Sequence, residues 1–423
     1  MTPPGVPGRS ALQRSRGTAA LGTAALGAEQ VSRRQAGGLI VVALILTGFT
    51  MRSAVTSVGP VLTELRSGLG ISSGAAGLVT TLPVLCFAAI GSNAPRLAHR
   101  FGFHRVVVFA LAAATAGVLT RAFAGSLWLF VLLSVLALAG GAIANVLMPS
   151  LVKQHFPDQI GRMTAAYTTA LAVGMTASAG LTVPISDAAG SWRFGLGCWA
   201  VLSGLAILPW LPTLRADKPD RRNAEPRVPM SRLIRSRTAW ALTVMFAFQS
   251  MQAYISFGWF PEFFRHEGLD GTRAGLLVSL FAAMSIPVSL VIPALAVRRQ
   301  RPLIAVMVGC AFVGYCGLVI APVGGAWLWM ALTGIGAGMF PLSLTMLGLR
   351  SRLITVTSAL SAFAQTVGYL IAGTGPLLVG FLLDITGDDW TWPFVLLFSA
   401  LLLSATGAWY ASRDVRVDDE ITV

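Results

Sequence analysis

Long apolar stretches alternate with short polar or charged segments from residue 38 to residue 411. A helix that crosses a bilayer needs about 20 mostly apolar residues, and twelve stretches meet this requirement. Glycine, proline and charged residues mark the joints, as at Pro95-Arg96 and Gly387-Asp388-Asp389. The predicted spans are 38–62, 74–95, 105–122, 127–149, 163–185, 194–212, 239–261, 274–296, 302–321, 326–347, 358–383 and 392–411.

The composition indicates the same class of protein. Of the 423 residues, 55% are hydrophobic and only 11% are charged, whereas a soluble protein carries roughly 25% charged residues. The 45 glycines suit helices that approach one another closely in a membrane. The sequence therefore predicts an all-α integral membrane protein, and it excludes a soluble enzyme and a secreted disulfide-rich scaffold.

The net charge of +14 has a pattern that predicts orientation, because basic residues favour the cytoplasmic side. With a cytoplasmic N-terminus, five of the 31 basic residues lie on the outer side and Arg52 lies inside the first span; all the others face the cytoplasm. The outer five are Arg66, Arg121, Arg193, Arg265 and Arg273. We therefore expect a multi-pass protein of the cytoplasmic membrane with both termini cytoplasmic. The charge gives no further support to nucleic-acid binding.

Three segments lie outside the spans. Residues 1–36 are rich in Gly, Ala, Ser and Arg and are expected to be a disordered cytoplasmic tail, although an Arg-rich leader can also imitate a targeting peptide. Residues 213–238 form a basic cytoplasmic linker, and 413–423 form a second cytoplasmic tail. The linker divides the spans into two bundles of six helices, at 37–212 and 239–412.

The two halves resemble each other at offsets of about 200 residues. Met51-Arg52 aligns with Met251-Gln252, Gly77-Leu78 with Gly275-Leu276, and Gly174 with Gly368. A parallel repeat of six spans resembles the major facilitator superfamily, in which substrate binds near the midplane between two pseudo-symmetric bundles. The resemblance implies alternating access between the two sides of the membrane.

Several blocks of sequence also resemble the cyanate/2-nitroimidazole transporter family. They are Arg52–Pro60, Gly77–Leu85, Asn145–Pro149, Gly161–Tyr167, Gln249–Tyr254 with Trp259-Phe-Pro261, and Ala359–Ser361 with Gln365 and Gly368-Tyr369. The family commonly has Asn two residues before the arginine of span 1, where this chain has Thr50. The resemblance implies a cyanate-like or nitroimidazole-like solute.

Arg52 is the main candidate for substrate contact. A charge at the middle of a span costs roughly 2.5–3.5 kcal/mol on insertion scales, and the sequence places no Asp or Glu at midplane depth. The planar guanidinium suits carboxylate-like or nitro oxygens. The alternative is a structural arginine that pairs with helix carbonyls or a distant acid.

Polar residues on other spans complete the candidate site. Gln249, Gln252, Ser256 and Trp259 share one helical face, and the repeat predicts that Gln252 lies opposite Arg52. The alternative role of these glutamines is hydrogen bonding between helices. Further candidates are Asn145, Tyr167, Gln365 and Tyr369, whereas Tyr254 is expected to pack against a neighbouring helix.

The remaining chemistry favours transport without a cofactor. The four cysteines and four histidines are scattered, so no metal site is expected. We predict a monomeric secondary active or facilitative transporter of a small anionic or nitro- or heteroaromatic solute, and not an enzyme. The alternatives are a proton-coupled exporter of drugs or toxic compounds and, more remotely, a transporter-like receptor or an integral-membrane enzyme.

Overall fold

The computed structural model describes residues 37–215, 229–296 and 298–421. The expected tail at 1–36 and most of the basic linker lie outside the described residues. We call 37–215 the N-terminal half and 229–421 the C-terminal half.

The N-terminal half is helical almost throughout. A helix at residues 37–50 precedes the first labelled element. The others are α2 (Ser53–Thr56), η1 (Gly59–Val61), α3 (Leu62–Leu69), α4 (Ser73–Ala89), η2 (Gly91–Asn93), α5 (Ala94–Phe101), α6 (Phe103–Arg121), α7 (Leu127–His155), η3 (Pro157–Gln159), α8 (Ile160–Ala188), α9 (Trp192–Gly197), α10 (Trp199–Leu205) and η4 (Leu208–Arg215).

The C-terminal half repeats this organisation. Its helices are α11 (Met230–Leu233), α12 (Arg237–His266), α13 (Gly271–Ala283), α14 (Ser285–Ala296), α15 (Gln300–Ile320), α16 (Ala326–Gly336), α17 (Met339–Leu349), α18 (Ile354–Thr386), α19 (Thr391–Ala411) and α20 (Val417–Glu420).

The helices account for the twelve predicted spans. Ten described helices are long and apolar enough to cross a membrane, and the pair α4 and α5, bent by 54°, makes an eleventh. The twelfth span corresponds to α12, whose glutamines lower its hydropathy. Most of the side chains of α12 are buried against neighbouring helices, above all α18 and α19, so its polar groups are shielded from lipid.

The loop expected between spans 2 and 3 is largely helical. Residues 94–101 form α5, and only Gly102 interrupts the path into α6. Gly102 has a φ of 99°, which a side chain would strain. The sequence placed a loop here because Pro95 and the basic residues read as a turn, but Pro95 occupies the first turn of α5, where proline is tolerated.

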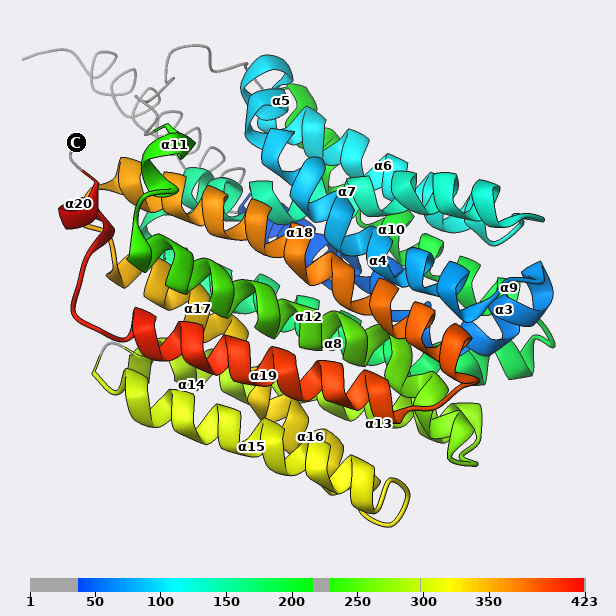
Figure 1. Cartoon of the computed structure of the whole chain (residues 1–423). Coiled ribbons are helices and arrows are strands. Elements are labelled where there is room, and N and C mark those ends of the chain that lie inside the picture. Colours follow the sequence, from blue (N-terminus) through cyan, green and yellow to red (C-terminus); the bar gives the residue numbers. More distant parts are fainter. Residues whose placement is uncertain (1–36, 216–228, 297, 422–423) are drawn as a thin grey trace, which may run out of the picture.

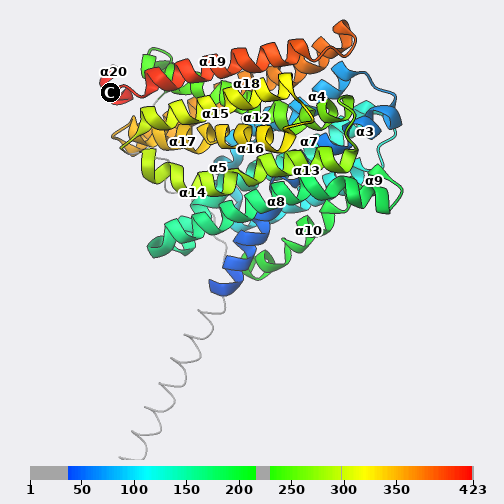
Figure 2. The same ribbon diagram turned by 90° about the horizontal axis from the view of Figure 1, so that it is seen from below.

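The two ends of the molecule differ. Figures 1 and 2 both show α20 at one end and α3 with α9 at the other. We call the first the terminal end and the second the closed end. At the terminal end α20 folds back, and the Glu420 carboxylate accepts hydrogen bonds from Ser236 and from Thr238 at the start of α12.

Matching glycines place helices of the two halves in contact. A side chain at Gly77 of α4 would lie 3.0 Å from the Pro376 carbonyl of α18, and one at Gly275 of α13 would lie 2.9 Å from the Ala179 carbonyl of α8. These glycines are equivalent in the sequence repeat. The repeat is therefore also a repeat of packing, which is the pseudo-symmetry expected of two six-helix bundles.

Candidate functional site

Arg52 lies at a break in the first span. The helix at 37–50 ends before it, and Arg52 has φ −118° and ψ 0° at the start of α2. Its carbonyl accepts the N–H of Thr56 at 3.1 Å, whereas the hydroxyl of Thr50 bonds to carbonyls of its own helix. The break turns the guanidinium toward the boundary between the two halves.

Aromatic rings from both halves surround this guanidinium. Its carbon lies 5.3 Å from the ring centre of Phe87 on α4 and 5.8 Å from that of Phe340 on α17. The hydroxyl of Tyr369 on α18 is a hydrogen-bond partner of Arg52, and the hydroxyl of Tyr254 on α12 interacts with it electrostatically. Cation–π contacts of this kind contribute about 0.5–2 kcal/mol each, so the rings stabilise a charge that would be unfavourable in lipid.

We call the rings of Phe87, Tyr254, Phe340 and Tyr369 around the Arg52 guanidinium the cage. Two polar groups in this cage lack hydrogen-bond partners within the protein. The Nε atom of Arg52 and the hydroxyl of Tyr254 are buried without a hydrogen-bond partner. Among the described carboxylates, none forms an ion pair with Arg52. Buried polar groups normally find partners. The site therefore offers unused donors to an acceptor supplied from outside.

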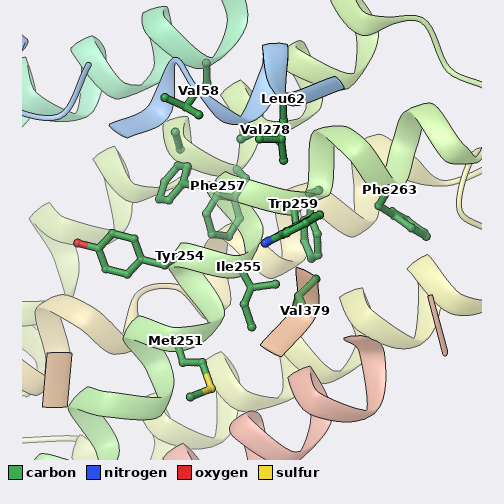
Figure 3. Packing of buried hydrophobic residues seen from close by; sticks show 14 of the residues in the cluster. Val58, Leu62, Met251, Tyr254, Ile255, Phe257, Trp259, Phe263, Val278 and Val379 are labelled. Carbon is green, nitrogen blue, oxygen red and sulfur yellow. The ribbon is translucent and has the colours of Figure 1, made fainter. Parts of the chain in front are cut away.

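Tyr254 packs against a neighbouring helix, as the sequence analysis expected, and belongs to the same buried cluster as Phe257 and Trp259. Its ring centre lies 6.4 Å from that of Tyr369, but its hydroxyl points away from Phe257 and Trp259 (Figure 3). The signal available in the sequence was a tyrosine inside the block that also carries the glutamines. Phe87 and Phe340 gave no signal, because apolar residues fill every span.

The structure does not turn Gln252 toward Arg52. Its amide nitrogen donates to Phe248 O at 3.0 Å and to the Ser404 hydroxyl at 3.4 Å, and its oxygen accepts the Tyr315 hydroxyl at 3.1 Å. All of these partners belong to the C-terminal half. The repeat correctly placed Gln252 on the helix equivalent to span 1, but the two side chains leave their helices in different directions because Arg52 sits at a helix break.

Gln249 and Gln252 both line one small cavity within the C-terminal half. Its amide nitrogen donates to Phe246 O at 3.2 Å and to the Ser250 hydroxyl at 2.7 Å, while its buried oxygen has no partner. Gln252 thus links α12 to α15 and α19 in this state, which is the alternative role given to it above, whereas both hydrogen bonds of Gln249 stay within α12.

The other candidates are distributed over both halves. Tyr369 is brought to Arg52, and its ring also packs 5.0 Å from that of Phe246. Gln365, one turn away on α18, donates to the Ser361 hydroxyl at 2.8 Å. Tyr167 packs inside the N-terminal half, and Asn145 is a partly exposed residue of α7. Of the predicted set, the structure brings together Arg52 and Tyr369.

Two ion pairs join the halves at the closed end. Arg66 on α3 contacts Glu262 on α12 at 2.6 Å, and Glu64 on α3 contacts Arg265 on α12 at 2.7 Å. At the other side of this end, the Asp384 carboxylate accepts the N–H groups of Ser73 and Gly74 at 2.9 and 2.6 Å. The carboxylates of Glu64, Glu262 and Asp384 therefore fasten one half to the other at this end.

The halves are less tightly packed elsewhere. A cavity of about 440 Å³ lies between α8 and α14. Its lining includes Thr164, Thr168, Ser285 and Ser289. Because α8 and α14 belong to different halves, this cavity is a gap along their boundary. Ion pairs therefore join the halves at the closed end, whereas this cavity separates parts of α8 and α14.

Comparisons with known proteins agree with this architecture. The family model described as Major Facilitator Superfamily matches residues 44–373. Among solved structures, a mutant of the nucleoside transporter NupG superposes with a TM-score of 0.73 at 11% identity, and the match covers 88% of this chain and 99% of that one. This likeness concerns the fold alone.

Curated relatives are similar over most of their length. The chain is 38% identical to the uncharacterized transporter YycB of Bacillus subtilis (strain 168), over 89% of this chain and 94% of the relative. It is 31% identical to the 2-nitroimidazole transporter of Escherichia coli (strain K12), over 90% and 96%, and 27% identical to the cyanate transport protein CynX of the same organism, over 86% and 96%. The chain therefore belongs to the Major Facilitator Superfamily and is a multi-pass membrane transporter.

Proposed function

We propose that this transporter moves a small anionic or nitro-aromatic solute, with Arg52 as the group that binds it. The observation that carries the proposal is the guanidinium held among Phe87, Tyr254, Phe340 and Tyr369 with no carboxylate partner among the described residues. Substrate oxygens accept charge-assisted hydrogen bonds from the guanidinium, and the rings accommodate a flat solute.

The names of two relatives support this substrate class. Cyanate is a small anion, and 2-nitroimidazole is a planar heteroaromatic ring with nitro oxygens; relatives named for their transport are similar over more than four-fifths of this chain. Both solutes present oxygen or nitrogen acceptors to the unused donors of the cage.

Orientation follows from the basic residues. The terminal end carries most of them, including Arg96, Arg100, Arg298, Arg350 and Arg352, so we assign it to the cytoplasm of the cell that makes the protein. The closed end is then the outer face, both termini are cytoplasmic, and residues 37–212 and 239–412 rock against each other. The protein works without enzymatic chemistry or a cofactor, either by facilitated diffusion or as a secondary active carrier.

The test is uptake by the purified protein in liposomes. We expect concentration-dependent uptake of radiolabelled cyanate or 2-nitroimidazole, and competition by small carboxylates but not by cations of similar size. Arg52→Lys keeps the charge but loses the planar fork, so KM should rise about tenfold, a loss of about 1.4 kcal/mol. Arg52→Gln should abolish saturable uptake.

Arg301→Lys is the matched control. Arg301 also lies over an aromatic ring, at 5.1 Å from Trp409, but it is exposed. This variant should transport as the wild type does. Unchanged KM in Arg52→Gln, with the wild type active, would show that Arg52 is structural.

A further inference from the structure

Arg121 is a second arginine inside the protein, on the closed-end side of Arg52. The sequence placed it at the outer end of span 3, and only 1% of its surface is exposed. Its terminal nitrogens donate to Ala54 O at 3.0 Å and to the Ser57 hydroxyl at 3.4 Å. Both acceptors belong to the segment that begins at Arg52, so the two arginines are supported by the same short stretch of span 1.

Arg121 faces a small cavity between the two halves. The cavity has a volume of about 20 Å³, enough for one water molecule. Its lining from the N-terminal half includes Arg121, Ser134 and Thr80, and its lining from the C-terminal half includes Tyr254 and Phe257. The N-terminal lining also contains Ala54, Val55, Val58 and Gly59, in the stretch that leads from Arg52 toward α3 and the closed end.

Three of the lining side chains carry a buried polar atom without a partner. These atoms are the Nε of Arg121, the hydroxyl of Ser134 and the hydroxyl of Tyr254. Each of the three residues is less than a tenth exposed. All three groups can donate a hydrogen bond, and none of the described carboxylates forms an ion pair with Arg121. An unpaired charge in a membrane interior normally faces a wet cavity or a ligand.

Some of the residues that line this cavity also form contacts between the two halves. A side chain at Gly59 would overlap the carbonyl of Phe257, and one at Gly258 would lie 3.0 Å from the side chain of Thr80. All four residues line the cavity. Separation of the halves at the closed end would break these contacts, widen the cavity and make Arg121 accessible.

We propose that Arg121, Ser134 and Tyr254 form a second anion-binding station, which receives the substrate from the outer side and passes it to Arg52. The inference deepens the proposed function and rests on it. Tyr254 belongs to both places, since the residue lines the cavity and its hydroxyl interacts with the Arg52 guanidinium. The ligand of the station is a small oxyanion, carboxylate or nitro group, because every free group at the station is a donor.

Charge-selective thiol labelling tests the station without any substrate. In a background with Cys86, Cys198, Cys310 and Cys316 replaced by alanine, Ser134→Cys is treated from outside with anionic or cationic methanethiosulfonate reagents of similar size. Rates are normalised to each reagent's rate with a free thiol. We expect the anionic reagent to be about tenfold faster, which corresponds to about 1.4 kcal/mol, and Arg121→Gln to remove the preference.

Ser203→Cys is the control, because Ser203 is equally buried in α10 but does not line the cavity. It should react with neither reagent. No preference for the anionic reagent at position 134, or no reaction there while a cysteine at Thr63 of the closed end reacts, would overturn the station. Arg121→Lys replaces Arg121→Gln if the latter does not fold, and it should retain part of the preference.

Transport then separates the two proposals. Arg121→Gln and Ser134→Ala should raise the KM for entry of cyanate or 2-nitroimidazole from the outer side several-fold. The affinity of the outer-closed state for the same solute should stay unchanged. Equal effects on both would show a structural role and overturn the station. If the wild type transports neither cyanate nor 2-nitroimidazole, the substrate class fails, whereas the labelling result still decides the station.

Discussion

Arg265 Nη1 lies 2.7 Å from Glu64 Oε1 and joins the end of α12 to α3 across the boundary between the halves. The neighbouring pair, Arg66 with Glu262, runs in the opposite sense, since its cation comes from the N-terminal half. Thr63 adds a hydrogen bond of 2.6 Å to Glu262. Each half thus contributes one acid and one base, and in the closed state each of the four charges has an ion-pair partner.

Removing one of these charges should favour the state that is open at this end. Glu64→Gln leaves Arg265 without its partner, and we expect a cysteine introduced at Ser134 to react with external thiol reagents several-fold faster. Glu64→Arg combined with Arg265→Glu restores an ion pair with reversed polarity and should restore the wild-type rate. Single surface pairs contribute only about 0–1 kcal/mol, so the shift is expected to be a few-fold and not complete.

Asp270 provides the control for that experiment. It pairs with Arg273 at 3.3 Å within one half, so Asp270→Asn removes a charge at the same end without touching the boundary. Equal acceleration by Asp270→Asn and Glu64→Gln would mean that net charge matters and that the ion pairs do not hold the halves together.

Gly59 should control closure by its lack of a side chain. A methyl group there would overlap the carbonyl of Phe257 on the opposite half, so Gly59→Ala prevents the two backbones from meeting. We expect reduced transport, fast external labelling at position 134 and normal expression. Gly37→Ala is the matched control, since no atom lies within 4 Å of the added group. Normal transport by Gly59→Ala would show that the contact is dispensable.

The two tyrosines of the cage should respond differently to loss of their hydroxyls. Tyr369 is a hydrogen-bond partner of Arg52 in this state, whereas the Tyr254 hydroxyl is unpartnered. Tyr254→Phe therefore removes a hydroxyl that has no partner in the protein and that we assign to ligand binding. The variant should raise KM without changing thermal stability. Tyr369→Phe should lower the melting temperature as well. Measurements of uptake and unfolding on both variants check this, and identical profiles would contradict it.

Much of the fold was predictable because hydrophobic length and glycine placement are local properties of the sequence. Gly77 and Gly275 are equivalent in the sequence repeat, and both lie against carbonyls of the opposite half. The helix breaks at Arg52 and between α13 and α14 were not predicted, since a continuous apolar run gives no signal for a change of direction inside the membrane.

The site was predictable only in its charge. Arg52 stood out because an arginine in mid-span is costly, but its neighbours are aromatic residues of a type found throughout the chain. Arg121 was placed on the outer side because it lies at the end of the apolar run of span 3. Its burial depends on contacts with Ala54 and Ser57, about 65 residues earlier in the chain, and sequence pattern carries no record of such contacts.

Gln252 separates a structural role from a role in binding. In this state its amide bridges Tyr315 and Ser404, so Gln252→Leu leaves the Tyr315 hydroxyl without one acceptor. A buried group left without a partner costs about 1–3 kcal/mol, and hydrogen bonds between membrane helices average about 0.6 kcal/mol. We therefore expect a lower melting temperature for Gln252→Leu, and an effect of similar size for Tyr315→Phe. The double variant should lose little more than either single variant, because the two changes remove the same hydrogen bond.

The KM for cyanate or 2-nitroimidazole should stay within about twofold of the wild-type value in Gln252→Leu, since the amide has no donor to spare for a ligand while its bonds to the C-terminal half persist. A tenfold rise in KM at unchanged stability would instead show that Gln252 turns toward Arg52 when substrate binds, as the sequence repeat predicted.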